Sequence, residues 1–105
     1  MLSLWSCQKQ RLNRYIGIYD GLKRVGTNAF DYTVTVKKVA DSKDEVWING
    51  RIVRLDKNGT YIDNNPNIHF EYNVRFEKDS LHIYDRSGSL GGSTEVWFNG
   101  RKRKK

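Results

Sequence analysis

Residues 45–55 read EVWINGRIVRL, and the Asn49-Gly50 pair at the centre of this stretch decides the fold class. Asn followed by Gly is the pair best able to adopt positive φ at both central positions of a type I′ turn. The stretch therefore predicts a β-hairpin with a two-residue loop. In that register Val46 faces Val53 and supplies an apolar pair for the core. We expect the chain to be built from antiparallel strands.

A second hairpin is predicted from residues 68–76, which read IHFEYNVRF and alternate between apolar and polar side chains. Such a period of two is typical of a half-buried antiparallel strand. If the chain turns at Lys78-Asp79, Phe76 lies opposite Leu81 and the apolar residues of both strands fall on one face. Two separate hairpins thus agree on an all-β chain.

Weaker alternation marks four further strands, over residues 15–22, 30–39, 60–63 and 95–98. Turn-forming sequences such as ADSKD, DNNPN and SGSLGGS separate the strands, and no long stretch shows helical periodicity. With 105 residues, the chain is long enough for one domain with a single modest core. We expect an all-β antiparallel meander of about seven to eight short strands that closes into a small barrel filled by its own side chains.

The net charge of +7 is concentrated at the two ends of the chain. Residues 101–105, RKRKK, hold five of the nineteen basic residues, and residues 1–14 hold three more without an acidic one. Residues 15–100 contain eleven basic and twelve acidic residues and are close to neutral. We therefore divide the chain into a terminal segment over residues 1–13, a barrel domain over residues 14–100 and a basic tail over residues 101–105.

Residues 4–7, LWSC, place Leu4 three residues before the single cysteine, Cys7, and resemble the cleavage box of bacterial lipoproteins. In that box the cysteine carries the lipid. Trp5 departs from the usual small or aliphatic residue, and only six residues precede Cys7, fewer than an export signal needs. Either the signal begins upstream of Met1, or Cys7 is a plain terminal thiol. We expect lipid attachment at Cys7 and a location at the bacterial cell envelope.

Residues 15–21, YIGIYDG, resemble the opening of the lipocalin-like (calycin) folds, in which a Gly-x-Trp motif closes one end of the barrel. Gly17 and Tyr19 match the glycine and the aromatic residue, with Tyr in place of Trp. In that family a basic residue near the last strand packs on the aromatic ring, and Arg101 or Lys102 is placed to do so. Over nearly the whole chain, the pattern resembles small lipocalin-like lipoproteins of bacterial envelopes.

Catalytic residues are not predicted. The alternation places both histidines, His69 and His82, on the polar face of their strands, where solvated surface histidines are ordinary. No nucleophile, metal or phosphate-binding motif occurs in the sequence. We expect no enzymatic activity, no cofactor and no metal.

Trp47, Ile52 and Trp97 are placed on outer faces by the same alternation. Tryptophan is enriched where interfaces concentrate their energy, so we expect these three residues to contact an unknown protein partner or a second copy of the chain. The expected function is a non-catalytic, envelope-associated binding or structural module that meets the membrane through its lipid anchor alone.

The alternative function is a small barrel that binds single-stranded nucleic acid through exposed aromatic side chains and basic ends. Trp47, Trp97, Tyr84 and Arg75 would form the stacking platform. A nucleic-acid groove should be lined by several basic residues, and the near-neutral core lacks a basic excess. Nucleic acid is therefore the less expected partner.

Overall fold

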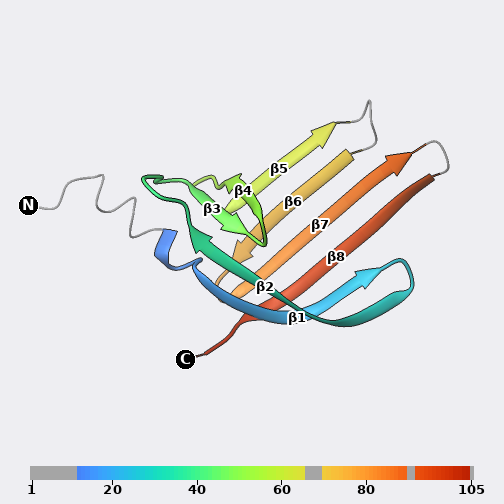
Figure 1. The fold of residues 1–105 in the computed structure, drawn as a ribbon, viewed down its shortest axis with the longest axis horizontal. Helices are drawn as coiled ribbons and strands as arrows, with labels where there is room; N and C mark the ends of the chain where they lie inside the picture. The colour runs from blue at the N-terminus through green and yellow to red at the C-terminus, as the bar shows by residue number, and fades with distance from the viewer. Residues whose placement is uncertain (1–11, 66–69, 90–91, 105) are drawn as a thin grey trace, which may run out of the picture.

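The computed structural model describes residues 12–65, 70–89 and 92–104, and these form a single antiparallel sheet of eight strands (Figure 1). The all-β meander predicted from the sequence is confirmed. The strands are β1 (Gly17–Val25), β2 (Asn28–Lys38), β3 (Glu45–Ile48), β4 (Arg51–Arg54), β5 (Thr60–Asn65), β6 (Phe70–Glu77), β7 (Ser80–Ser89) and β8 (Gly92–Lys102).

The sheet curls into a nearly closed barrel with the strand order β4-β3-β2-β1-β8-β7-β6-β5. Pairing between β1 and β8 joins the two halves of the chain. β4 and β5 are the edges of the sheet, and residues 55–59 connect them. Within this link the Gly59 N–H donates to the Asp56 carbonyl over 3.0 Å, and the Gly59 carbonyl accepts from the Phe76 N–H over 2.9 Å. The link therefore follows the end of the barrel.

Both predicted hairpin registers are confirmed. Val46 pairs with Val53 across β3 and β4, and both valines are buried. Asn49 and Gly50 have φ angles of 44° and 94°, the positive values that the turn requires. In the second hairpin Phe76 pairs with Leu81, so turn chemistry and alternation together fixed the pairing.

β7 and β8 are much longer than the sequence suggested. The Gly/Ser-rich stretch was expected to be a turn, but the pairing continues through Ser87 opposite Thr94 as far as Ser89 opposite Gly92. An antiparallel ladder is held by backbone groups, so small side chains do not end it. At the other end, β8 includes Arg101 and Lys102 of the expected basic tail. The strand continues there because β1 supplies a pairing edge.

The chain before β1 also joins the barrel. Leu12 and Tyr15 are buried, and the Tyr15 N–H donates to the Leu12 carbonyl over 2.9 Å in a single turn. Leu12 belongs to the terminal segment that we placed outside the barrel domain, but its side chain packs in the core. Cys7 and His69 lie outside the described residues. The structure describes no helix that is long and apolar enough to cross a membrane.

The two ends of the barrel differ. At one end lie the chain before β1, the link of residues 55–59 and the β6–β7 turn; we call it the closed end. At the other end lie the β1–β2 turn and the far ends of β5 to β8; we call it the open end, and the shorter β3–β4 hairpin points toward it. Figure 1 shows the short β3–β4 hairpin reaching only part of the way along β5 and β6, whose far ends extend beyond it.

Candidate functional site

The closed end is filled by aromatic rings. Tyr19 is fully buried, and its hydroxyl donates to the Tyr15 carbonyl over 3.0 Å. The ring centroid of Phe76 lies 4.7 Å from that of Tyr15 and 5.8 Å from that of Tyr19. Burial, and secondarily the charge of Asp79, raises the pKa of Tyr19 strongly. The interior of this end is packed, and the Tyr19 hydroxyl is held in an internal hydrogen bond.

Lys102 covers the closed end. Its amine lies 6.0 Å from the centroid of the Tyr19 ring and donates to the Arg14 carbonyl over 2.6 Å. Gly17 leaves room for the lysine stem, because a Cβ there would lie 3.2 Å from the Lys102 Cε. Arg101 is exposed, since neighbouring residues of a strand point to opposite faces. The basic contact on Tyr19 thus comes from Lys102 and not from Arg101.

Arg103 fastens the last strand on the outer face. Its Nε and Nη2 donate to the two carboxylate oxygens of Asp20 over 2.8 and 2.7 Å, and its N–H donates to the Ile18 carbonyl over 2.6 Å. The hydrogen bond from Arg103, and then that from Thr33, holds the pKa of Asp20 below its usual value. Part of the basic C-terminal run therefore closes the barrel and is not a free arm.

Gly21 and Gly100 face each other across β1 and β8, midway between the two ends. A Cβ on Gly21 would overlap the Asn99 carbonyl oxygen and the Gly100 Cα, and a Cβ on Gly100 would overlap the Phe98 ring. The two backbones approach each other more closely here than any side chain allows. Figure 1 shows β1 curving strongly along its length.

The open end contains a cavity of about 210 Å³. Side chains from seven strands reach it, because the inward-facing positions continue past the packed core toward the strand ends. Polar and charged residues line it together with apolar ones: Lys23, Tyr32, Val34, Ile48, Asn49, Arg51, Tyr72, Ile83, Asp85, Val96 and Phe98.

Two cations lie on aromatic faces around this cavity. The Lys23 amine is 4.2 Å from the centroid of the Tyr32 ring. The Arg51 guanidinium carbon is 4.0 Å from the centroid of Tyr72 and 5.8 Å from that of Phe70. Both distances are within the range of a cation–π contact. Among the described residues, neither Lys23 nor Arg51 has a carboxylate oxygen within 4.0 Å.

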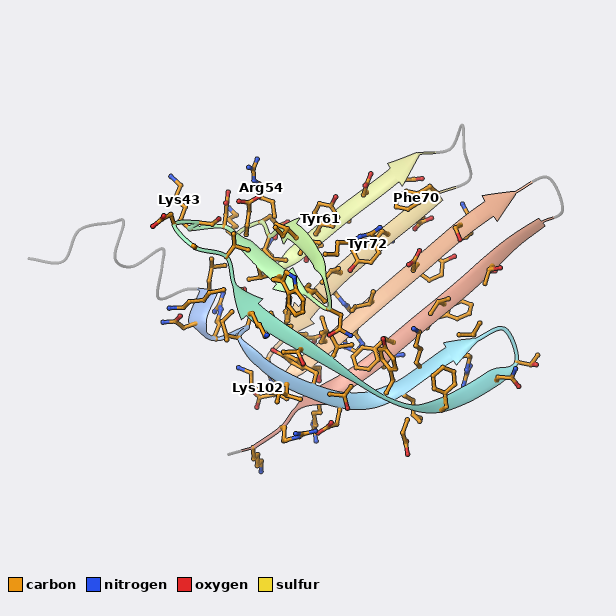
Figure 2. All side chains as sticks on the ribbon, in the orientation of Figure 1. Lys43, Arg54, Tyr61, Phe70, Tyr72 and Lys102 are labelled. Carbon is orange, nitrogen blue, oxygen red and sulfur yellow. The ribbon has the colours of Figure 1, made fainter. Side chains whose placement is uncertain are left out.

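Aromatic side chains form two walls beside the cavity. On the β5–β6 side, the ring centroids of Tyr61 and Tyr72 are 6.1 Å apart, and Figure 2 shows both residues and Phe70 on the half of the barrel away from Lys102. On the β2 side, the Tyr32 centroid lies 6.4 Å from that of Phe30 and 6.1 Å from that of Phe98. Such walls suit a flat or apolar ligand.

The charges of the open end are unevenly compensated. Burial raises the pKa of Tyr72, while the neighbouring Arg51 opposes the rise, so Tyr72 is a neutral phenol at physiological pH. Asp85 is the one carboxylate among the residues that line the cavity, against two cations. Within the described residues, no three His, Cys, Asp or Glu side chains lie together as metal ligands would.

The predicted outer contact surface is divided by the sheet. Trp47 pairs with Ile52, which is 55% exposed, and the Lys37 amine lies 5.0 Å from the Trp47 ring centroid. Trp97 lies elsewhere. Trp97 pairs with Arg24, which in turn pairs with Ala29 near the start of β2. Trp47 pairs with Lys37, near the end of β2. The structure brings Trp47 and Ile52 together and leaves Trp97 apart from them.

Trp97 packs on Tyr84, with ring centroids 5.4 Å apart. These two rings belong to the stacking platform of the nucleic-acid alternative, but acidic groups lie beside them. The Tyr84 hydroxyl donates to the Glu95 carboxylate over 2.9 Å, and Glu71 lies 3.7 Å from Arg86. His82 has an ordinary surface partner, the Asn99 side chain, at 2.5 Å. Cations flank the pair as well, since Arg24 lies directly opposite Trp97 in the β1–β8 ladder.

Sequence reasoning missed the cations of the open end, although one signal was available. The predicted hairpin placed Val53 on the core face, and Arg51 falls on the same face because it is two residues earlier in the strand. A charged residue on the core-facing side of a strand indicates a binding site or a solvent-exposed rim of the barrel. Lys23 carries the same signal relative to Tyr19.

Comparison with protein-family models, with curated proteins and with solved structures gave no match.

Proposed function

We propose that this protein is a non-catalytic binding module that takes a small ligand into the open end of its barrel. The observation that carries the proposal is the pair of cations, Lys23 and Arg51, that lie on aromatic rings around a cavity with no described carboxylate oxygen within 4.0 Å of either. Lys23 is half-buried, and a protein that needed only a stable barrel would gain more from an apolar residue at that position. The closed end, filled by Tyr15, Tyr19 and Phe76, gives the contrast.

The size of the cavity limits what enters it. Pockets for drug-sized ligands hold roughly 300–1,000 Å³, and about 210 Å³ is smaller. One ring or a short acyl segment fits this space. The rest of a longer ligand would lie along the aromatic walls, where Phe30 is 44% exposed.

Binding can be tested with phenylnaphthylamine, a neutral dye that fluoresces in apolar surroundings. We expect a saturable rise in fluorescence on titration with the wild type. Val96 lines the cavity, so Val96→Trp should fill it and weaken binding at least about tenfold. Ile52→Trp adds the same ring to the outer face and should leave binding unchanged. Absence of saturable binding, or equal binding by both variants, would contradict the proposal; circular dichroism checks that each variant is folded.

The location at the bacterial envelope, with a lipid on Cys7, belongs to the same proposal. Its support is the LWSC stretch and the resemblance to small lipocalin-like lipoproteins. Mass spectrometry of the protein purified from its native host tests it. A diacylglyceryl modification on Cys7 is expected, and an unmodified Cys7 in the mature protein would refute the tether while leaving the binding site untouched.

A further inference from the structure

We infer that the ligand of the open end is a monoanion in which a carboxylate or sulfonate group adjoins a flat apolar body. This inference rests on the proposed function and specifies its ligand class. The acidic group would lie between Arg51 and Lys23, and the apolar body would contact the surrounding rings.

Arg51 differs from the arginines that form ion pairs. Four described arginines, Arg54, Arg75, Arg86 and Arg103, lie 2.7–3.7 Å from carboxylate oxygens and project outside the barrel. Arg51 lines the cavity from its exposed rim and lies over the Tyr72 ring. Stacking occupies the face of a guanidinium and leaves the N–H groups at its edge available. Those groups match a carboxylate or sulfonate in bidentate geometry.

Lys23 adds a second cation from β1, so that the cavity is charged on two sides. Its amine lies over Tyr32, a ring that lines the same cavity as Tyr72. A lysine ammonium has three donors, and a cation–π contact leaves donors free for an oxyanion. The two side chains come from strands far apart in the sequence, and each is held by its own aromatic ring.

Asp85 determines which ligand charge suits the cavity. With two cations and one carboxylate among the lining residues, the cavity has a formal charge of +1. A single negative charge on the ligand neutralises it. A dianion such as a phosphate monoester would bring excess negative charge against Asp85, and like charges at close range disfavour binding. A neutral ligand would leave both cations partly desolvated without an anion to compensate them.

Two dyes with the same rings test the inference: anilinonaphthalene sulfonate, a monoanion, and phenylnaphthylamine, which is neutral. We expect the wild type to bind the sulfonate about tenfold more tightly than the neutral dye. Arg51→Gln should reduce this preference to about threefold or less, with little change for the neutral dye. Arg54→Gln, on the outer face of the same strand, is the matched control and should keep the full preference.

The outcomes separate the inference from the proposed function. If both dyes bind the wild type equally, or if Arg51→Gln keeps the full preference, the monoanion inference is overturned while the binding site stands. If neither dye binds, both the proposed function and the monoanion inference are refuted. Lys23→Gln provides a second variant with the same expected loss of preference, should Arg51→Gln fail to fold.

Discussion

A basic side chain over a tyrosine ring occurs at both ends of the barrel, and its surroundings differ. At the closed end, Lys102 lies over Tyr19 and donates to the Arg14 carbonyl over 2.6 Å. At the open end, Arg51 lies over Tyr72, and no described carboxylate is within 4.0 Å. The same pair of groups stabilises the fold where the chain supplies the acceptor. Under the proposed function, it binds a ligand where the acceptor comes from outside the chain.

The aromatic rings also differ between the closed end and the open end. Tyr19 is fully buried and its hydroxyl has a backbone acceptor, so removing it would disrupt internal packing. Phe30 is 44% exposed at the open end, and its ring centroid lies 6.4 Å from that of Tyr32. Mutations should therefore affect stability at one end and ligand affinity at the other.

The largest effect on stability is expected at Gly21, midway between the two ends of the barrel. Gly21→Val would drive a side chain into the Asn99 carbonyl and the Gly100 backbone, which cannot move without parting β1 from β8. We expect a loss of about 3 kcal/mol or more in the free energy of unfolding, measured by urea denaturation. Gly26→Ala is the control, because no atom lies within 4 Å of its Cβ position and only its φ of 61° opposes alanine. That control should cost about 1 kcal/mol. Equal losses would refute the close approach of β1 and β8.

A matched pair of truncations compares the two ends directly. Leu81 is fully buried near the closed end, and Leu81→Ala should lower the free energy of unfolding by about 2–5 kcal/mol. Phe30→Ala removes a larger but exposed side chain at the open end and should cost less than about 1 kcal/mol. Phe30→Ala should instead weaken dye binding. A stability loss for Phe30→Ala as large as that for Leu81→Ala would show that both ends are core.

A smaller effect is expected for the cation of the closed end. Lys102→Ala removes the hydrogen bond to the Arg14 carbonyl and the cover on Tyr19, and it should destabilise the protein by about 1 kcal/mol. Arg101→Ala, one residue earlier and exposed, should change stability by less than about 0.5 kcal/mol. Neither variant should alter dye binding at the open end. The reverse order of the two losses would assign the packing role to Arg101.

The smallest effect concerns Asp20 and its dependence on pH. Because Arg103 lowers the pKa of Asp20 in the folded state, the pair stabilises the fold above the ordinary aspartate pKa. This contribution is lost as the pH falls through the lowered pKa, and it weakens at high salt because the pair is exposed. Asp20→Asn should therefore be slightly less stable than the wild type at neutral pH and equal to it in strong acid. A difference that persists in strong acid would assign the effect to another contact.

Local pairing could be predicted from the sequence because its causes are local. Asn49-Gly50 fixes a two-residue turn, and alternation fixes which face of each strand is buried. The pairing of β1 with β8 has no such signal, since Gly21 and Lys23 interrupt the apolar alternation of β1. The candidate site depends on that long-range pairing, which joins the half of the sheet that carries Lys23 and Arg51 to the half that carries Tyr72 and Asp85. Its charges could be found in the sequence, but their meeting could not.

The ladder between β1 and β8 has a consequence for how the chain folds. Every other ladder of the described sheet joins consecutive strands, whereas this one joins Tyr19 to Lys102. Hairpins close over short loops, so each half can form by itself, but closure of the barrel must wait for the longest loop in the protein. During synthesis β1 leaves the ribosome long before its partner exists. Until β8 emerges, the inner rings of both halves are exposed to water and to other chains.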